Sequence, residues 1–183
     1  KKDTFLIDPK DIQRKITKKT KAIMVVHLYG LMCDMTEIMK LAKKNNLFVL
    51  EDCAQCFFAK DEKKRIAGTI GDVGSWSFEN SKHITTGDGG VVTTNNKILA
   101  KKMREFSCAG FRNVTASSGK VRIDRNKFQD PNWKRHNTLA YNYRLPEVAA
   151  AIGLAQIERK NFFLSKRIQM GKKFKKIITS SKC

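Results

Sequence analysis

Three polar side chains of different chemistry follow one another in the central part of the sequence. Asp52 comes just after the apolar run 47–50, Ser77 lies in a second short segment with apolar residues, and Lys82 follows five residues later, before a glycine-rich turn. Taken singly, such residues are most often a helix cap, a turn and a solvated charge. Together they supply a carboxylate, a hydroxyl and a primary amine.

This set of groups is the one that pyridoxal phosphate chemistry requires. Such an enzyme uses a lysine to form a Schiff base with the cofactor aldehyde and a carboxylate to keep the pyridine nitrogen protonated, and it needs donors for the phosphate. The chemistry can operate only if the fold brings Asp52, Ser77 and Lys82 to one place.

The surrounding pattern predicts elements that could position these residues. The continuous apolar run 22–26 predicts a strand buried on both faces. Asp34, with Glu37 three residues later, predicts a helix start, and 47–50 predicts a second strand. Strand, helix and strand form one βαβ unit and hence a parallel sheet. Ligands of such sheets bind at the carboxyl ends of the strands. His27 follows the first predicted strand, and Asp52 follows the second.

Beyond this unit the pattern continues as strands and helices. We expect strands at 74–78 and 91–94, a helix at 98–106, a polar irregular loop at 110–138 and helix from Pro146 toward residue 178. Loops of that length are usually functional or disordered.

Five segments of the chain, in order, resemble the motifs of the DegT/DnrJ/EryC1/StrS family, the pyridoxal-phosphate-dependent sugar aminotransferases. They are the segments VHLYG at 26–30, EDCAQ at 51–55, SFENSK at 77–82, TTGDGG at 85–90 and YNYR at 141–144. The resemblance extends from Asp3 to about Ile178. Asp88 departs from the glutamate usual in the family, and this change removes none of the groups named above.

The resemblance implies a role for each of five residues. Lys82 would form the Schiff base, and Asp52 would pair with the pyridine nitrogen as the second catalytic residue. Gln55 would contact the ring hydroxyl, and Ser77 would bind the phosphate. Asn142 would reach the phosphate held by a neighbouring subunit, so we expect a homodimer with shared active sites.

The same resemblance implies the fold. We expect an α/β fold of three layers with a mostly parallel sheet flanked by helices, like the large domain of fold type I aminotransferases. Residues 1–145 would form the central part of that domain, with a basic loop at 110–138, and 146–183 a long helix leading toward a C-terminal small domain. The family's N-terminal part and small domain are expected to be absent here, so the chain would be a fragment that is inactive alone.

The implied activity is transfer of an amino group from an amino acid, expected to be glutamate, to a keto group of a nucleotide-linked deoxysugar. We expect this reaction to belong to nucleotide-sugar and polysaccharide biosynthesis and to take place in the cytoplasm. Three alternatives stay open: a related sugar dehydratase, a branch that makes amino-cyclitols or aminobenzoates, and an inactive truncated remnant. The dehydratases replace the lysine with histidine, whereas Lys82 is retained here.

The charge, the motifs and the cysteine count bear on three other kinds of function: nucleic-acid binding, membrane insertion and metal binding. The net charge is +20, from 37 basic and 17 acidic residues, but no nucleic-acid-binding motif and no apolar run long enough for a membrane span is present. The five cysteines predict free thiols, and no metal site is expected. In the basic loop, Lys134 and Arg135 lie nearest Asn142 in sequence and are candidate contacts for the substrate diphosphate, with His27 as a third candidate substrate contact.

Overall fold

The computed structural model describes residues 1–180 and divides the chain into two compact units. The first unit comprises residues 1–76 and 92–145, and the second comprises residues 77–91 with the helical segment that begins at Pro146. Each unit is described by itself below. Within the described residues, no helix is both long enough and apolar enough to cross a membrane.

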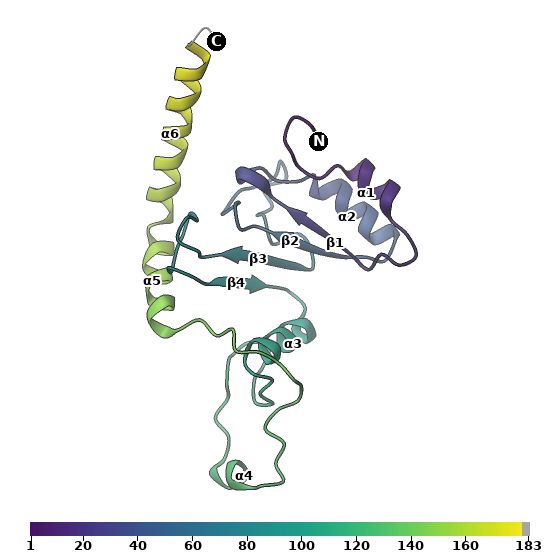
Figure 1. Cartoon of the computed structure of the whole chain (residues 1–183), viewed down its shortest axis with the longest axis vertical. Helices are drawn as coiled ribbons and strands as arrows, with labels where there is room; N and C mark the ends of the chain where they lie inside the picture. The colour runs from purple at the N-terminus through teal and green to yellow at the C-terminus, as the bar shows by residue number, and fades with distance from the viewer. Residues whose placement is uncertain (181–183) are drawn as a thin grey trace. The chain divides into compact units, whose positions relative to one another are not determined.

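The first unit begins with the predicted βαβ arrangement (Figure 1). Helix α1 (Pro9–Lys15) starts with proline, and the Asp8 side chain accepts the Lys10 N–H at 3.0 Å. Strand β1 (Ala22–Val26) and the short 3-10 helix η1 (Leu28–Gly30) then lead to α2 (Met35–Lys44) and strand β2 (Phe48–Asp52). Asp34 caps α2 by accepting the Glu37 N–H at 3.1 Å, as its position predicts.

The sheet has the strand order β1-β2-β3-β4, completed by β3 (Val73–Ser77) and β4 (Gly90–Thr93). Strands β1, β2 and β3 are parallel, with Val26 opposite Asp52 and Asp52 opposite Ser75. The arrows of β3 and β4 run in opposite directions in Figure 1, so the sheet is mixed. The prediction of an α/β fold with a mostly parallel sheet is confirmed.

One expectation for the sheet is wrong. Strand β1 is not buried on both faces: Ile23 and Val25 are buried, whereas Met24 is 58% exposed. The covered face packs on α1 and α2 through a core that includes Ile12, Ile38 and Val49. Within the first unit, side chains alternate along β1 between this core and the open face, as in a strand covered on one side.

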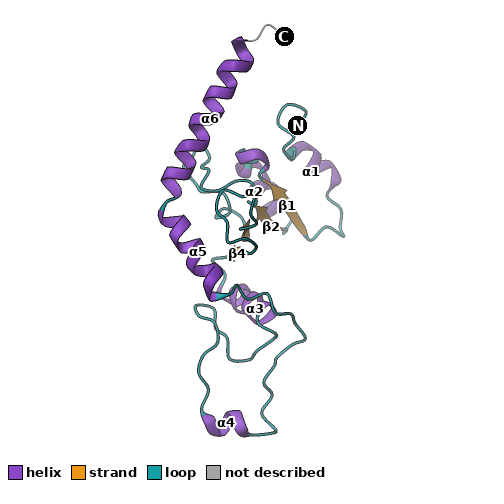
Figure 2. Ribbon diagram, turned by 60° about the vertical axis from the view of Figure 1, so that its left-hand side comes forward, coloured by secondary structure: helices purple, strands orange, loops and turns teal. Residues whose placement is uncertain are grey.

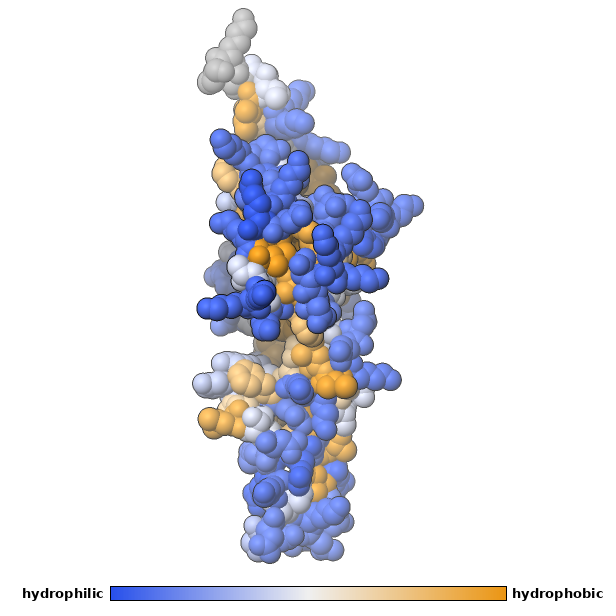
Figure 3. Space-filling model, turned by 90° about the vertical axis from the view of Figure 1, so that its right-hand side faces the viewer, coloured by the Kyte–Doolittle hydropathy of each residue, from blue (hydrophilic) through white to orange (hydrophobic). Residues whose placement is uncertain are grey.

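The rest of the first unit is α3 (Lys97–Ser107), the basic loop 110–138 and the segment up to residue 145. The loop is not wholly irregular, since Arg125–Gln129 forms the short helix α4, capped by Asp124 (Figure 2). Its residues are mostly exposed, with Val114 buried. Figure 3 shows a face on which hydrophilic side chains predominate, in keeping with the net charge of +20.

The second unit contains the turn region that begins at Ser77 and the helices α5 (Glu147–Glu158) and α6 (Lys160–Ser180). The segment expected to be one long helix is therefore two helices, separated at Arg159. The face predicted from Val148 and Ile152 is apolar, but these side chains are 75% and 45% exposed.

Candidate active site

Asp52 is the last residue of β2, where two neighbouring strands hold its backbone. Its carbonyl oxygen accepts the N–H of His27 at 3.0 Å, and the next N–H, that of Cys53, donates to the Ser75 carbonyl at 2.8 Å. The ladder thus continues to the carboxyl end of the sheet. Because strand side chains alternate, Asp52 and its neighbour Glu51 point to opposite faces.

The half-buried Asp52 side chain has one committed oxygen and one open oxygen. Oδ1 accepts the Ala54 N–H at 2.9 Å, which fixes the orientation of the carboxylate. Within residues 1–180, Oδ2 has no hydrogen-bond donor. Asp52 can therefore accept one further N–H group at the open face of the sheet.

Gln55 lies on the same loop and is also half-buried. Its Oε1 accepts the backbone N–H of Tyr29 at 3.1 Å, so the loop after β2 is tied to η1 after β1. Tyr29 itself has a φ of 54°, in the left-handed region. The Nε2 donors of Gln55 stay available, and the structure thus brings together the first two strand ends and two of the predicted residues.

His27 and Glu51 form a fully buried pair on the opposite face. His27 Nε2 lies 3.0 Å from Glu51 Oε2, and His27 Nδ1 accepts the Cys33 N–H at 3.0 Å. Since Nδ1 accepts a hydrogen bond, the proton of the ring lies on Nε2 and is donated to Glu51. His27 has no exposed surface, so the expected contact with substrate does not agree with its position in this structure.

Glu51 also holds the loop 66–71 through three backbone N–H groups. Gly68 donates to Oε2 at 2.8 Å, and Ile70 and Gly71 donate to Oε1 at 2.7 and 2.6 Å. Burial raises the pKa of Glu51. The hydrogen bonds from His27 and these N–H groups together lower it by more than burial raises it, so the net shift is downward. The carboxylate is therefore a buried anion with its acceptor positions filled.

Gly68 explains why this loop can approach Glu51 so closely. Its φ is +81°, and a Cβ atom there would lie 2.1 Å from the Trp76 ring and 3.0 Å from Cys53 Sγ. Only glycine fits such a position without displacement.

Cys53 joins His27 and Glu51 in a cluster whose potential ligand atoms lie within 4.8 Å of one another. Burial, together with the nearby Glu51 charge, raises the pKa of the Cys53 thiol, so the thiol stays protonated and is a poor metal ligand. Both ring nitrogens of His27 and both carboxylate oxygens of Glu51 already form hydrogen bonds within the protein. The described cysteines are free thiols, whereas Cys183 lies outside the described residues.

In the second unit, Ser77 opens a compact turn region. Ser77 Oγ accepts the Glu79 N–H at 3.3 Å, which leaves the hydroxyl proton free to be donated. Phe78 closes the region by pairing its N–H with the Gly89 carbonyl at 2.8 Å and its carbonyl with the Thr86 N–H at 2.9 Å. The turn at Gly87 has a φ of +85°.

Lys82 lies within this turn region and is half-buried. Its N–H donates to the Glu79 carbonyl at 3.1 Å, and its carbonyl accepts from Arg167 of α6 at 3.3 Å. Within the described residues, its amine makes no hydrogen bond or ion pair. The Lys82 backbone is thus held from both sides, whereas its amine is not.

Helix α5 supports the same turn region. The Gln156 side chain accepts the Thr85 N–H at 2.9 Å, and a Cβ atom on Gly153 would come within 3.0 Å of Thr86. The neighbouring His83 is half-buried; burial and the Arg167 charge lower its pKa. The helix beyond Pro146 therefore contributes to the position of Lys82, a role that our sequence reading missed.

Asn142 lies in the first unit, on a segment that pairs with the end of α3. Tyr141 and Tyr143 donate their N–H groups to the Phe106 and Ser107 carbonyls at 3.1 and 2.8 Å. Asn142 Oδ1 accepts from Arg144 at 2.8 Å, and its side chain is exposed with its Nδ2 donors unused within the described chain.

The two basic candidates of the loop differ in how they are held. Arg135 donates to the Phe128 carbonyl at 3.2 Å, and its guanidinium lies 4.6 Å from the centroid of the Phe128 ring. Lys134 is exposed, and its side chain makes no hydrogen bond, ion pair or cation–π contact with the described residues. The role of Glu51 was also missed, although its place two residues after Val49, on the same face of the strand, could have indicated burial.

Comparison with known proteins places these motifs in a family. The model of the DegT/DnrJ/EryC1/StrS aminotransferase family matches residues 1–182. The GDP-perosamine synthase of Escherichia coli O157:H7 is 42% identical over 178 residues, which cover 97% of this chain and 44% of that protein. The GDP-perosamine synthase of Caulobacter vibrioides is 40% identical over 166 residues, 90% of this chain and 39% of that protein.

Solved structures give the same result. The X-ray structure of the aminotransferase from Psychrobacter cryohalolentis has a TM-score of 0.74 and 38% identity, over 87% of this chain and 38% of that one. The chain thus spans less than half the length of the proteins that it matches. The family match over residues 1–182 and the 42% identity together show that this chain belongs to the DegT/DnrJ/EryC1/StrS aminotransferase family.

Proposed function

We propose that the protein is a pyridoxal-phosphate-dependent aminotransferase that moves an amino group from an amino acid to a keto group of a nucleotide-linked sugar. The observation that supports this most is Lys82, which follows the Ser77 motif and whose amine makes no hydrogen bond or ion pair within the described residues. Glutamate is the proposed donor. The similarity to two GDP-perosamine synthases supports a GDP-linked sugar as acceptor.

The functional groups of the proposed site fit the cofactor. Lys82 would hold its aldehyde carbon, and Asp52 would stand beside the ring nitrogen. Gln55 would donate to the ring hydroxyl, Ser77 to the phosphate, and Asn142 of a partner subunit to the same phosphate. Each of these side chains keeps an unused donor or acceptor in the described structure, as the preceding contacts show.

When bound, pyridoxal phosphate supplies an electron sink for a carbanion at the substrate carbon. The chain's own residues have two tasks around it. The negative charge of Asp52 stabilises a proton on the ring nitrogen, and its orientation is fixed by the Ala54 N–H. The amine of Lys82 would act as the acid and base that moves a proton between the substrate carbon that bears the amino group and the aldehyde carbon of the cofactor.

Two alternatives have specific support and are separated by the product. An Escherichia coli GDP-4-keto-6-deoxy-D-mannose-3-dehydratase with bound hydrated PLP superposes with a TM-score of 0.80 at 28% identity. A putative aminotransferase of an amino-dideoxy-inosose from Micromonospora echinospora is 33% identical over 168 residues. Retention of Lys82 favours amino transfer over dehydration. We place the reaction in nucleotide-sugar and polysaccharide biosynthesis, in a cytoplasmic homodimer.

The experiment uses the full-length enzyme that contains this chain, with Lys82→Ala and the control Lys97→Ala, at the exposed start of α3. Lys82→Ala should abolish the cofactor link that borohydride makes permanent and should abolish amino transfer from glutamate to a GDP-linked 4-keto sugar. Lys97→Ala should leave both intact. A covalent cofactor link that survives in Lys82→Ala would exclude the assignment, and a dehydrated product without nitrogen would favour the dehydratase.

A further inference from the structure

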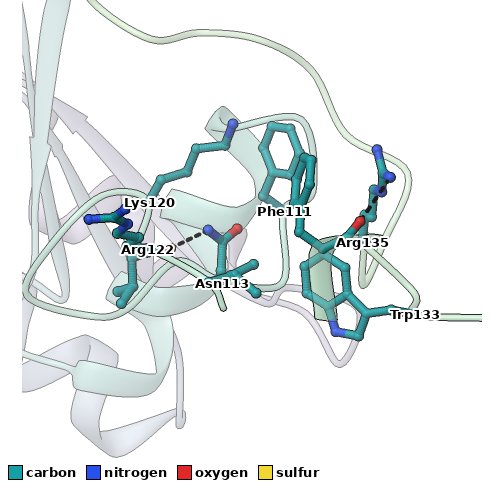
Figure 4. Close-up of a pocket in the computed structure, with 9 residues that line it drawn as sticks. Phe111, Asn113, Lys120, Arg122, Trp133 and Arg135 are labelled. Carbon is teal, nitrogen blue, oxygen red and sulfur yellow. Dashed lines mark hydrogen bonds between the residues drawn. The ribbon is translucent and has the colours of Figure 1, made fainter. Parts of the chain in front are cut away.

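The basic loop contains a pocket of about 320 Å³ that the sequence did not predict (Figure 4). All its lining residues belong to the first unit, and we call it the loop pocket. Its lining residues are Phe111, Asn113, Lys120, Val121, Arg122, Ile123, Phe128, Trp133 and Arg135. The volume lies at the lower end of the range, about 300–1,000 Å³, in which proteins bind small molecules.

Aromatic rings form much of the wall. Phe111, Phe128 and Trp133 line the pocket, and the centroids of the last two rings lie 6.4 Å apart. The Lys120 amine lies 3.7 Å from the centroid of Phe111, and Arg135 covers Phe128. These contacts hold rings and cations side by side, an arrangement that suits a planar ligand with a negative charge.

The charge of the pocket is positive and uncompensated. Lys120, Arg122 and Arg135 line it, and no acidic side chain does. Within residues 1–180, none of the three forms a salt bridge. Arg122 also makes no side-chain hydrogen bond to the described residues, so its guanidinium can bind an anion without first breaking a contact.

Asn113 adds an acceptor between the rings and the cations. Its Nδ2 donates to the Val121 carbonyl at 2.5 Å, which fixes the amide, and Figure 4 shows it between Arg122 and Phe111. Its Oδ1 has no donor within the described chain. This oxygen can accept a hydrogen bond from the N–H edge of a ligand ring.

We propose that the loop pocket binds the nucleoside diphosphate part of the substrate, with the base against the aromatic rings and the phosphates near Arg122 and Lys120. The inference rests on the proposed function for the identity of the ligand, and on the loop pocket for its place. An aromatic ring and an anion in one molecule account for both kinds of wall. A solvated basic loop would account for the charge, but not for the three rings around one hollow.

The first test measures GDP binding to the full-length enzyme at low salt. Arg122→Gln removes a guanidinium that has no described contact, so the fold should tolerate it. Arg125→Gln removes the same charge three residues away, on α4 and outside the pocket lining. Loss of one charge-assisted phosphate contact predicts about tenfold weaker GDP binding for Arg122→Gln, against a change below about twofold for the control, where only screened surface charge is lost. Equal effects, or none, would overturn the proposal.

A second test follows the base. Trp133 fluorescence should be quenched on addition of GDP, and Trp133→Phe should lose that quenching while GDP still binds. Inorganic phosphate at the same concentration should neither quench Trp133 nor displace GDP. Full displacement by phosphate would show that only the charge is recognised, and quenching that persists in Trp133→Phe would place the base elsewhere; either result overturns the proposal.

Failure of this inference can be told from failure of the proposed function. The half-reaction with glutamate needs the cofactor residues but no nucleotide. If amino transfer proceeds and GDP binding ignores Arg122, the loop pocket is wrong and the function stands. If the enzyme does not transfer amino groups but binds GDP through Arg122 and Trp133, the loop pocket stands and the function is wrong.

Discussion

The carboxyl ends of β1 and β2 and the basic loop are built by different means, although both belong to the first unit. At the sheet end, Glu51 is fully buried and receives hydrogen bonds from His27 and three backbone N–H groups. In the basic loop, most side chains are exposed, and contacts such as Lys120 over Phe111 involve rings and cations near the surface.

This difference indicates a division of labour. In a buried network in which every hydrogen-bonding group has a partner, each atom is held in one position. Such a network suits a site that must keep a charge beside the reacting ring of a cofactor. An exposed set of rings and cations can adjust and bind a large anionic ligand, at the cost of sensitivity to salt. We therefore expect changes at the sheet end to affect rate and stability, and changes in the loop to affect substrate affinity.

The largest effect is expected for Asp52→Asn. The substitution keeps the size of the side chain but removes the charge that would stabilise a proton on the ring nitrogen. The turnover number should fall roughly 100-fold or more, as when an electrostatic stabiliser is removed, while the cofactor stays bound. Single-turnover kinetics and the cofactor absorbance measure the two separately. Near-normal turnover of Asp52→Asn would mean that another acid performs this task.

The sequence predicted the sheet end better than the loop for a physical reason. The apolar runs 22–26 and 47–50 predicted two strands, and their residues Val25 and Val49 lie in the core. Strand ends in a parallel sheet necessarily lie together. Adjacent motif residues such as Asp52 and Gln55 could therefore be located.

The remaining features depend on contacts between segments with no shared period. Nothing in the local sequence indicates that Glu51 would accept hydrogen bonds from the backbone of a loop 17 to 20 residues away. In the same way, the pairing of Lys120 with Phe111 and of Arg135 with Phe128 follows from loop conformation alone. The open face of β1 was also missed, because an apolar run does not reveal which face is covered.

Two glycines test the contrast in packing. Gly68→Ala places a Cβ atom 2.1 Å from the Trp76 ring at a φ of +81°, whereas a Cβ on Gly119 in the basic loop meets nothing within 4 Å. Overpacking and backbone strain predict a loss of about 2–4 kcal/mol for Gly68→Ala. Gly119→Ala should change the free energy of unfolding by less than about 0.5 kcal/mol. Denaturant titration of both variants checks this, and similar losses would contradict the contrast.

Glu51→Gln tests the buried anion. It leaves backbone N–H groups facing an amide in place of a carboxylate, and a loss of about 1–3 kcal/mol is expected from weakened hydrogen bonds. Exposed Glu62→Gln is the matched control. The turnover number and the cofactor absorbance are then compared between Glu51→Gln and Glu51→Ala. If both are higher in Glu51→Gln, Glu51 acts by holding the strand end that carries Asp52.

The same residue predicts a pH dependence. The pKa of Glu51 is lowered below its ordinary 4.5 in the folded protein, so its contribution to stability is complete above that value and is lost as the pH falls through the folded pKa. Wild type should therefore lose stability below about pH 4.5 more steeply than Glu51→Gln. Thermal unfolding between neutral and acidic pH measures the slopes, and identical slopes would show that Glu51 does not carry this linkage.

The smallest effect is expected at the edge of the basic loop, for Lys134→Gln combined with Arg135→Gln. Lys134 has no described partner, and Arg135 contacts Phe128, so the pair loses charge near the loop pocket without disturbing the sheet. Exposed ionic contacts are each worth at most about 1 kcal/mol, which predicts a Michaelis constant for the sugar nucleotide roughly threefold to tenfold higher. Cofactor binding and the half-reaction with glutamate should be unchanged, and the effect should shrink as salt screens the charges. Lys127→Gln, on α4 but outside the pocket lining, is the control. An unchanged Michaelis constant at low salt would show that neither Lys134 nor Arg135, which lines the loop pocket, contacts the substrate phosphates.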